Sequence, residues 1–275
     1  MNRREFVRIG SAVTALLAMG RLPVLARTGD MLPAAVEPVT GFLPGYDPPT
    51  QRGLRGDHRL TYDLVLWQQR APATGITQNG MAGEVIVERV RVPEGVRYSI
   101  DEIRRYAAVE NRLTARLTCA PDDLRTLRAW ESRASWRPSR AAPPLRHELA
   151  PLSSGGRKDG DRVLHSDGRR EGSERPLATL WSLTDFIARR AGPATDVSLD
   201  LLVDLSHVSP DARLRYDGPV DVAVAHGRRL RCATYLLTGH GILPTHYLVD
   251  DRGLPQLVTA SMVSYALREV EAVAT

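Results

Sequence analysis

The feature that most constrains the fold is a series of short segments between Leu214 and Leu267 in which apolar and polar residues alternate. Successive side chains of a β-strand point to opposite faces of a sheet, so a period of two predicts strands and not helices. Turn signals such as His226-Gly227 and Gly239-His240-Gly241 separate the segments at intervals of about ten residues. This spacing predicts a large antiparallel sheet.

Similar segments occur earlier in the chain, so we expect an all-β fold in which two antiparallel meanders build one curved sheet or half-barrel. The expected strands lie at 58–69, 84–92, 96–107, 113–119, 197–205, 220–224, 230–238, 243–249 and 257–267. Residues 130–136 also alternate as a strand would, with a helix as the competing interpretation, and 121–124 suit one helical turn.

The best helix candidate runs from about Leu180 to Arg189. Leu180, Leu183 and Ile187 are spaced to lie on one helix face, and Gly192-Pro193 gives the expected end signal. We expect this helix to lie against the concave face of the sheet, in a domain with one or two short helices.

The N-terminus matches the twin-arginine export motif, with the pair Arg3-Arg4, the apolar Phe6 and the basic Arg8. The mildly apolar segment that follows is too short for a membrane span, and small residues predict cleavage after Ala26. The alternative is an amphipathic helix of a soluble protein. We expect the translocation machinery to recognise residues 1–26 and a soluble periplasmic protein with no transmembrane segment in its mature chain.

Removing this leader changes the charge argument. The whole chain has 37 Lys and Arg against 32 Asp and Glu, but residues 1–26 hold four arginines and only Glu5, which leaves 33 against 31. So small an excess over a whole domain gives no reason to expect nucleic acid as a partner.

The mature chain divides into a lead-in and one domain. Residues 27–56 are rich in proline and glycine, which predicts an extended segment and not a packed element. Residues 57–271 form a single β-rich domain. Within it, 138–175 is expected to be a loop-rich insertion with weak edge strands at 146–149 and 162–165.

Cys119 and Cys232 lie on predicted strands, one in each meander. An oxidising periplasm favours a disulfide between them. Against it, twin-arginine substrates fold in a reducing cytosol, and free cysteines pack well as small apolar groups. The sequence leaves both possibilities open.

No motif predicts a metal, a cofactor or a catalytic residue. His207, His226, His240 and His246 have no metal-ligand spacing, and neither a nucleophile elbow nor a phosphate-binding glycine loop occurs. The sequence therefore favours a binding protein over an enzyme. A periplasmic hydrolase whose residues converge from distant strands stays an alternative.

The aromatic residues are the candidate ligand contacts. Trp67, Trp130, Trp136 and Trp181 are expected mainly in the core between sheet and helix, with a ligand cleft as the alternative. The ligand-binding candidates are Trp67, Trp181, Phe186, Tyr235 and Tyr247.

The order of elements over residues 58–268 resembles that of exported bacterial proteins of unknown function, whose sheets are similar to the curved half-barrels of periplasmic lipoprotein carriers. The resemblance is carried by Tyr235-Leu236-Leu237-Thr238-Gly239, by 244–250 and by Gly253-Leu254-Pro255. It implies a concave sheet plugged by a helix. A helix that fills the concave side only in part predicts a carrier of an apolar or lipid-like ligand, and one that fills it predicts a structural or partner-binding module of the envelope.

Overall fold

A computed structural model describes residues 34–51, 53–54, 56–67, 69–70, 77–105, 109–138, 150–189, 193–260 and 262–273. All belong to a compact unit from Pro33 to Thr275. A separate unit, Met1–Leu32, contains the predicted leader, so the export motif at Arg3, Arg4 and Phe6 and the cleavage site after Ala26 lie outside the described residues.

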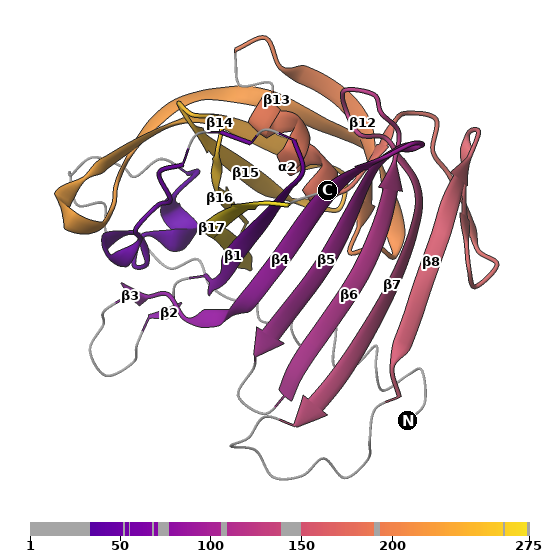
Figure 1. Ribbon diagram of the computed structural model, residues 1–275, viewed down its shortest axis with the longest axis horizontal. Coiled ribbons are helices and arrows are strands. Elements are labelled where there is room, and N and C mark those ends of the chain that lie inside the picture. Colours follow the sequence, from indigo (N-terminus) through magenta and orange to yellow (C-terminus); the bar gives the residue numbers. More distant parts are fainter. Residues whose placement is uncertain are drawn as a thin grey trace. The chain divides into compact units, whose positions relative to one another are not determined.

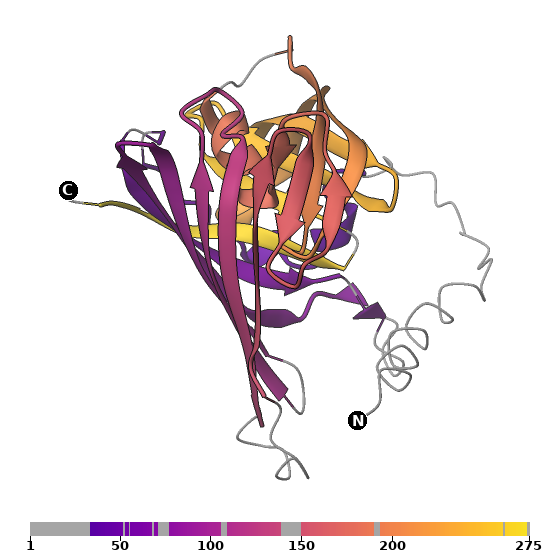
Figure 2. The same ribbon diagram turned by 90° about the vertical axis from the view of Figure 1, so that its right-hand side faces the viewer.

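Fifteen strands form one large curved sheet that does not close into a barrel (Figures 1 and 2). They are β1 (His58–Leu66), β4 (Met81–Val92), β5 (Gly95–Arg105), β6 (Val109–Cys119), β7 (Leu127–Pro138), β8 (Leu152–Asp159), β9 (Arg162–His165), β10 (Arg170–Gly172), β11 (Leu177–Ala178), β12 (Asp196–Val203), β13 (His207–Ala223), β14 (Arg229–Gly239), β15 (Ile242–Asp250), β16 (Pro255–Thr259) and β17 (Val263–Ala272). The short strands β2 (Gln69–Arg70) and β3 (Thr77–Gln78) pair separately.

Two meanders make up this sheet, as the sequence predicted. One runs from β4 to β10 and the other from β12 to β17, and the first strand, β1, lies between β4 and β17 and joins them. Neighbouring strands are antiparallel except β11 and β12, which are parallel and flank α2 in the chain. The all-β prediction is therefore confirmed.

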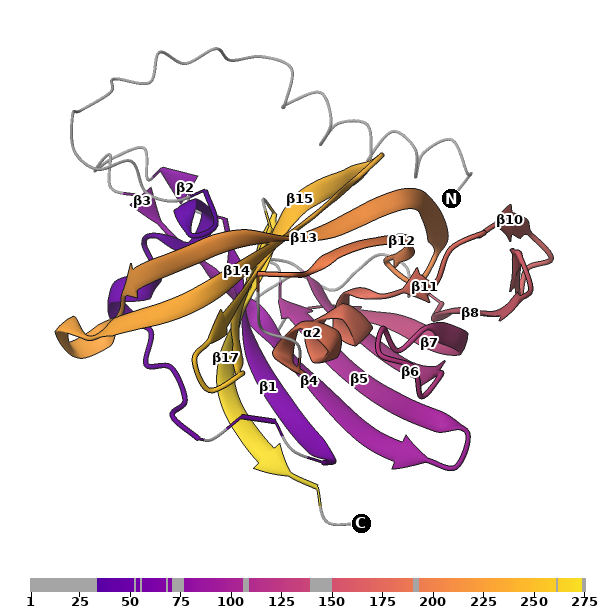
Figure 3. The same cartoon turned by 90° about the horizontal axis from the view of Figure 1, so that it is seen from above.

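Helix α2 (Leu180–Arg189) lies against the concave face at the predicted residues (Figure 3). Thr179 caps its start: the Ser182 backbone N–H donates to Thr179 Oγ1 at 3.2 Å, and the Thr179 N–H donates to Ser182 Oγ at 2.9 Å. This reciprocal pair has the form of a capping box. The apolar face, which includes Leu183 and Ile187, is buried in the core.

The alternation places two separate cores on the two faces of the sheet. The larger core contains α2 and side chains from both meanders. The smaller contains Val220, Val222 and Leu257 from the second meander together with Val39 and Tyr46 from the lead-in. The part of the second meander that carries these residues is thus packed on both faces.

The prediction that residues 27–56 form an unpacked, extended lead-in is wrong for its described part. Two 3-10 turns, η1 (Glu37–Val39) and η2 (Leu43–Gly45), supply apolar side chains to the smaller core. The buried Tyr46 hydroxyl lies 2.9 Å from the Leu267 carbonyl and 2.8 Å from Gln256 Oε1. Proline fixes the backbone dihedral of these turns, so a proline-rich composition is compatible with tight packing.

Three local predictions also need correction. In the part of 138–175 that the structure describes after residue 149, strands β8, β9 and β10 form instead of the expected loop with one weak edge strand. The edge strand expected at 162–165 is confirmed as β9, and 146–149 lies outside the described residues. The run at 257–267 is divided between two strands, β16 and β17. The break was not predicted because the sequence between these strands contains no glycine or proline. Residues 121–124 form a bend and turn with no helix.

The two cysteines are both free and buried. Cys119 packs in the larger core and Cys232 in the smaller one, so they belong to different faces of the sheet. Burial raises the pKa of the Cys119 thiol to about 12. Each cysteine occupies its core as a small apolar group.

The outer face of the first meander carries charged side chains paired across strands. Arg112 Nε donates to Asp101 Oδ1 at 2.8 Å, and Arg116 lies 3.0 Å from Glu131. Such exposed pairs contribute at most about 1 kcal/mol each. They mark a solvated surface, in contrast to the covered outer face of the second meander.

Candidate functional site

The concave side of the first meander contains a cavity that α2 leaves open. Figures 1 and 2 show β5, β6 and β7 continuing beyond the helix. The cavity has a volume of about 620 Å³. Its lining comprises Ile100, Glu102, Arg104, Val109, Asn111, Leu113, Ala134, Trp136, Thr179, Leu180, Trp181, Leu202, Asp204, Leu205 and Tyr265, and we call this the concave cavity.

The cavity walls are apolar side chains that the protein covers only in part. Val109, Leu113, Trp136 and Leu180 are half-buried. At the other end of the same strands, equivalent inward positions such as Leu117 are completely buried in the core. The helix therefore covers one end of the concave surface and leaves the other end accessible.

The inner end of the cavity is an aromatic cluster. The Trp181 ring meets Tyr265 edge-on, with 5.1 Å between centroids, and lies 5.7 Å from the Tyr62 ring. Trp181 is 7% exposed and Tyr62 is fully buried. Edge-on and tilted aromatic pairs stabilise beyond their burial, so this wall is rigid and is set by the first turn of α2.

A small polar group interrupts the apolar lining. The buried Glu102 forms an ion pair with Arg104, whose Nη2 donates to the Tyr265 hydroxyl at 3.4 Å. Burial, and then the nearby Glu102 charge, raises the pKa of Tyr265, so its hydroxyl stays protonated at neutral pH. An apolar cavity with a few fixed polar groups suits binding of an elongated ligand and orientation of its polar end.

The structure places the five predicted ligand contacts in different surroundings. Only Trp181 lines the concave cavity. Phe186, Tyr235 and Tyr247 are buried in the larger core, with Tyr235 stacked edge-on against Tyr216 at 5.6 Å. Trp67 is 41% exposed at the end of β1 and is not among the residues that line the cavity.

The four tryptophans also divide. Trp130 and Trp181 lie in the core, as the sequence favoured, whereas Trp136 lines the cavity and Trp67 is exposed. Sequence reasoning missed Leu113 and Ala134 as site residues and gave Trp136 as a cleft residue only in the alternative interpretation. The alternation of 130–136 did carry a signal, since it puts Trp130, Ala134 and Trp136 on one face of a strand.

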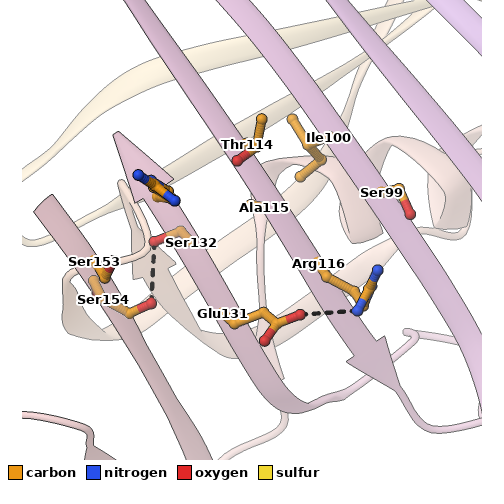
Figure 4. A pocket seen from close by; sticks show the side chains of 10 residues that line it. Ser99, Ile100, Thr114, Ala115, Arg116, Glu131, Ser132, Ser153 and Ser154 are labelled. Atoms are coloured by element: carbon orange, nitrogen blue, oxygen red, sulfur yellow. Dashed lines mark hydrogen bonds and ion pairs between the residues drawn. The ribbon is translucent and has the colours of Figure 1, made fainter. Parts of the chain in front are cut away.

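The opposite face of the same strands has a second, shallower hollow of about 470 Å³ (Figure 4). Its outward-facing side chains are short or charged, including Ser99, Thr114 and Ser153. Arg116 and Glu131 cross it as an ion pair at 3.0 Å. Because this surface is polar and open, it is a poorer site for an apolar ligand than the concave cavity.

Titratable groups do not assemble a metal or nucleophile site among the described residues. No group of three or more His, Cys, Asp or Glu side chains is placed to hold a metal ion in that part of the chain. His207, His226 and His240 are exposed there, and burial lowers the pKa of the half-buried His246. The Thr179 hydroxyl of the cavity is engaged in capping α2.

Comparison with known proteins gives no relative: no protein family matches this chain, and neither does any curated protein or solved structure. Among the described residues no helix combines the length and apolarity that crossing a bilayer would require.

Proposed function

We propose that this protein binds or carries an elongated apolar or lipid-like ligand in the concave cavity, without catalysing a reaction. The observation that carries the proposal is the open volume of about 620 Å³ between the start of α2 and the inward faces of β5, β6 and β7. It lies within the range of roughly 300–1,000 Å³ typical of small-molecule sites.

The energetics support an acyl chain as the ligand. Burying one methylene group stabilises by about 0.8 kcal/mol, so eight methylenes supply roughly 6 kcal/mol before the cost of association. The half-buried walls at Leu113 and Trp136 are unfilled apolar surface that such a chain would cover. Arg104, Glu102 and the Tyr265 hydroxyl are the groups that would meet its polar end.

The proposed place of action is the periplasm, reached in the folded state through the twin-arginine machinery. The leader motif at Arg3 and Arg4 supports this. Changing both arginines to lysine should abolish accumulation of the mature protein in the periplasm. Undiminished export of that variant would contradict the proposed route.

Native mass spectrometry of protein purified from the periplasm tests the binding function. We expect a copurified apolar molecule, or, with delipidated protein, saturable binding of a fluorescent fatty acid that unlabelled fatty acid displaces. An apo mass together with no binding of the probe would refute carriage and favour a structural or partner-binding envelope module. Turnover of an ester, glycoside or peptide that depends on one polar residue would favour a hydrolase instead.

A further inference from the structure

A second cavity, of about 340 Å³, lies at the C-terminal half of α2, away from the residues of the helix that line the concave cavity. Four of the described side chains that line it are arginines and one is a carboxylate. The lining residues are Leu54, Gly56, His58, Arg89, Arg91, Arg125, Asp185 and Arg189, and we call this the arginine cavity.

Arg89 is the most buried of these arginines, with a side chain 4% exposed. Its Nη1 donates to the Gly56 carbonyl at 2.9 Å and to Asp57 Oδ1 at 3.2 Å, while its Nε lies 3.4 Å from Asp185. The guanidinium is thereby fixed in place from two sides. A fixed, buried guanidinium is the usual anchor of an anion site.

Asp185 is shared by several partners. It accepts a hydrogen bond from the Tyr98 hydroxyl at 2.8 Å, and Arg189 Nη2 and Arg125 Nε lie 3.2 and 3.5 Å from its Oδ2. Burial acts to raise the pKa of Asp185, but the charges of Arg189 and Arg89 outweigh it and hold that pKa below its ordinary value. The carboxylate is therefore ionised at neutral pH.

The arginine cavity has more positive charge than its carboxylates neutralise. Four arginines stand against the two carboxylates Asp185 and Asp57, so the described residues that line or pair with the cavity carry two more positive charges than negative ones. Burial lowers the pKa of His58, so that residue adds a neutral hydrogen-bonding group at pH 7. A structural role for α2 accounts for the ion pairs of Asp185 but not for this excess.

Two buried polar atoms at the cavity have no hydrogen-bond partner among the described residues. One is a donor, Arg125 Nε, which lies 3.5 Å from Asp185 Oδ2, and the other is an acceptor, Asp185 Oδ1, which lies 3.4 Å from Arg89 Nε; each makes an ion-pair contact but no hydrogen bond. A buried polar atom without a hydrogen bond destabilises the protein. A group that fills the cavity and both accepts and donates hydrogen bonds would satisfy both atoms.

We propose that the arginine cavity binds a protonated phosphate oxyanion, either hydrogen phosphate or the singly protonated monoanion of a phosphate monoester. Its oxygens would accept hydrogen bonds from Arg89, Arg91 and Arg125, and its P–OH would donate to Asp185. The carboxylate is the selective element, because sulfate has no proton to donate at neutral pH and would bring a negative charge against Asp185. This proposal does not rest on the ligand proposed for the concave cavity.

Isothermal titration calorimetry of the mature protein with inorganic phosphate, and separately with sulfate, tests the proposal. We expect saturable phosphate binding and at least tenfold weaker sulfate binding. Arg91→Gln should weaken phosphate binding about tenfold, because a charge-assisted hydrogen bond is lost from an exposed residue whose backbone contacts remain. Arg128→Gln, an exposed arginine outside the cavity, should leave it unchanged.

Three results would overturn the proposal: no heat of binding with phosphate, equal affinity for sulfate, or equal loss in the Arg91 and Arg128 variants. Titration with dihexanoyl phosphatidic acid distinguishes the source of the phosphate. If that lipid binds more tightly than inorganic phosphate and Ala134→Trp in the concave cavity abolishes the difference, the phosphate belongs to a lipid headgroup. Equal affinity, unaffected by Ala134→Trp, identifies the free oxyanion or a soluble monoester as the ligand.

Discussion

The two halves of the sheet show the same alternation in sequence but differ in how they are covered. Every residue of β16 in the second meander is buried, whereas only three of the eleven residues of β6 in the first are buried. The second meander has the lead-in on its outer face and the larger core on its inner face. The first has paired charges outside and α2 over only part of its inner face.

This difference shows that the concave cavity is a consequence of incomplete coverage. Period-two alternation determines which side chains face inward, but the length of α2 determines how many of them are buried. A helix of ten residues is about 15 Å long, shorter than the strands β4 and β5, of 12 and 11 residues at about 3.3 Å per residue, that it contacts through Asp185. The uncovered strand ends of β5, β6 and β7 form the concave cavity.

The largest effect on stability should distinguish two leucines, one in each half. Leu257→Ala removes a fully buried side chain between the sheet and the lead-in, so we expect a loss of about 2–5 kcal/mol in the free energy of unfolding. Leu113→Ala removes a half-buried wall of the concave cavity and should cost at most about 1 kcal/mol. Urea unfolding measures both. Equal losses would mean that the first meander is as fully packed as the second.

A smaller effect should come from the contact that ties the lead-in to the second meander. Tyr46→Phe keeps the ring but removes the hydroxyl that bonds to Gln256 and the Leu267 carbonyl, so we expect a loss of about 1–3 kcal/mol. Tyr216→Phe, at a half-buried ring of the other face, is a control with little expected effect. No loss in the Tyr46 variant would indicate that the lead-in does not hold its packed position in solution.

The smallest of these effects concerns the attachment of α2 to the first meander at acid pH. Burial lowers the pKa of His58 below 6.5, so the unfolded chain binds a proton more readily than the fold. The stability that neutral His58 contributes is complete above pH 6.5 and is lost as the pH falls toward the folded pKa. The slope of unfolding free energy against pH between 6.5 and 5 should flatten in His58→Gln and not in the exposed His207→Gln. An unchanged slope in the His58 variant would contradict this account.

Much of the secondary structure could be predicted because it depends on local chemistry. Strand alternation and the spacing of Leu180, Leu183 and Ile187 are set by backbone periodicity, so the all-β class and the bounds of α2 were predicted correctly. The errors involved tertiary contacts. The lead-in packs because of a partner surface more than 200 residues away in the chain, as the Tyr46 hydrogen bonds show.

The site was less predictable than the fold. Trp181 was predicted to contact a ligand because it lies on the predicted helix, and it does line the concave cavity. Phe186, Tyr235 and Tyr247 proved to be core residues. Whether an inward aromatic side chain lines a cavity depends on where the helix ends above it, which sequence periodicity does not encode. The arginine cavity was missed for a related reason, since Arg89, Arg125 and Asp185 come from three distant segments.

The most direct test compares two substitutions at neighbouring positions of β7. Ala134 faces the concave cavity and the adjacent Ser135 faces the opposite side of the strand. With a fluorescent fatty acid as the probe, Ala134→Trp should fill the cavity and weaken binding at least tenfold, while Ser135→Trp should bind as the unmodified protein does. Equal affinity of the two variants for the probe would contradict the claim that the open half of the sheet is the binding site.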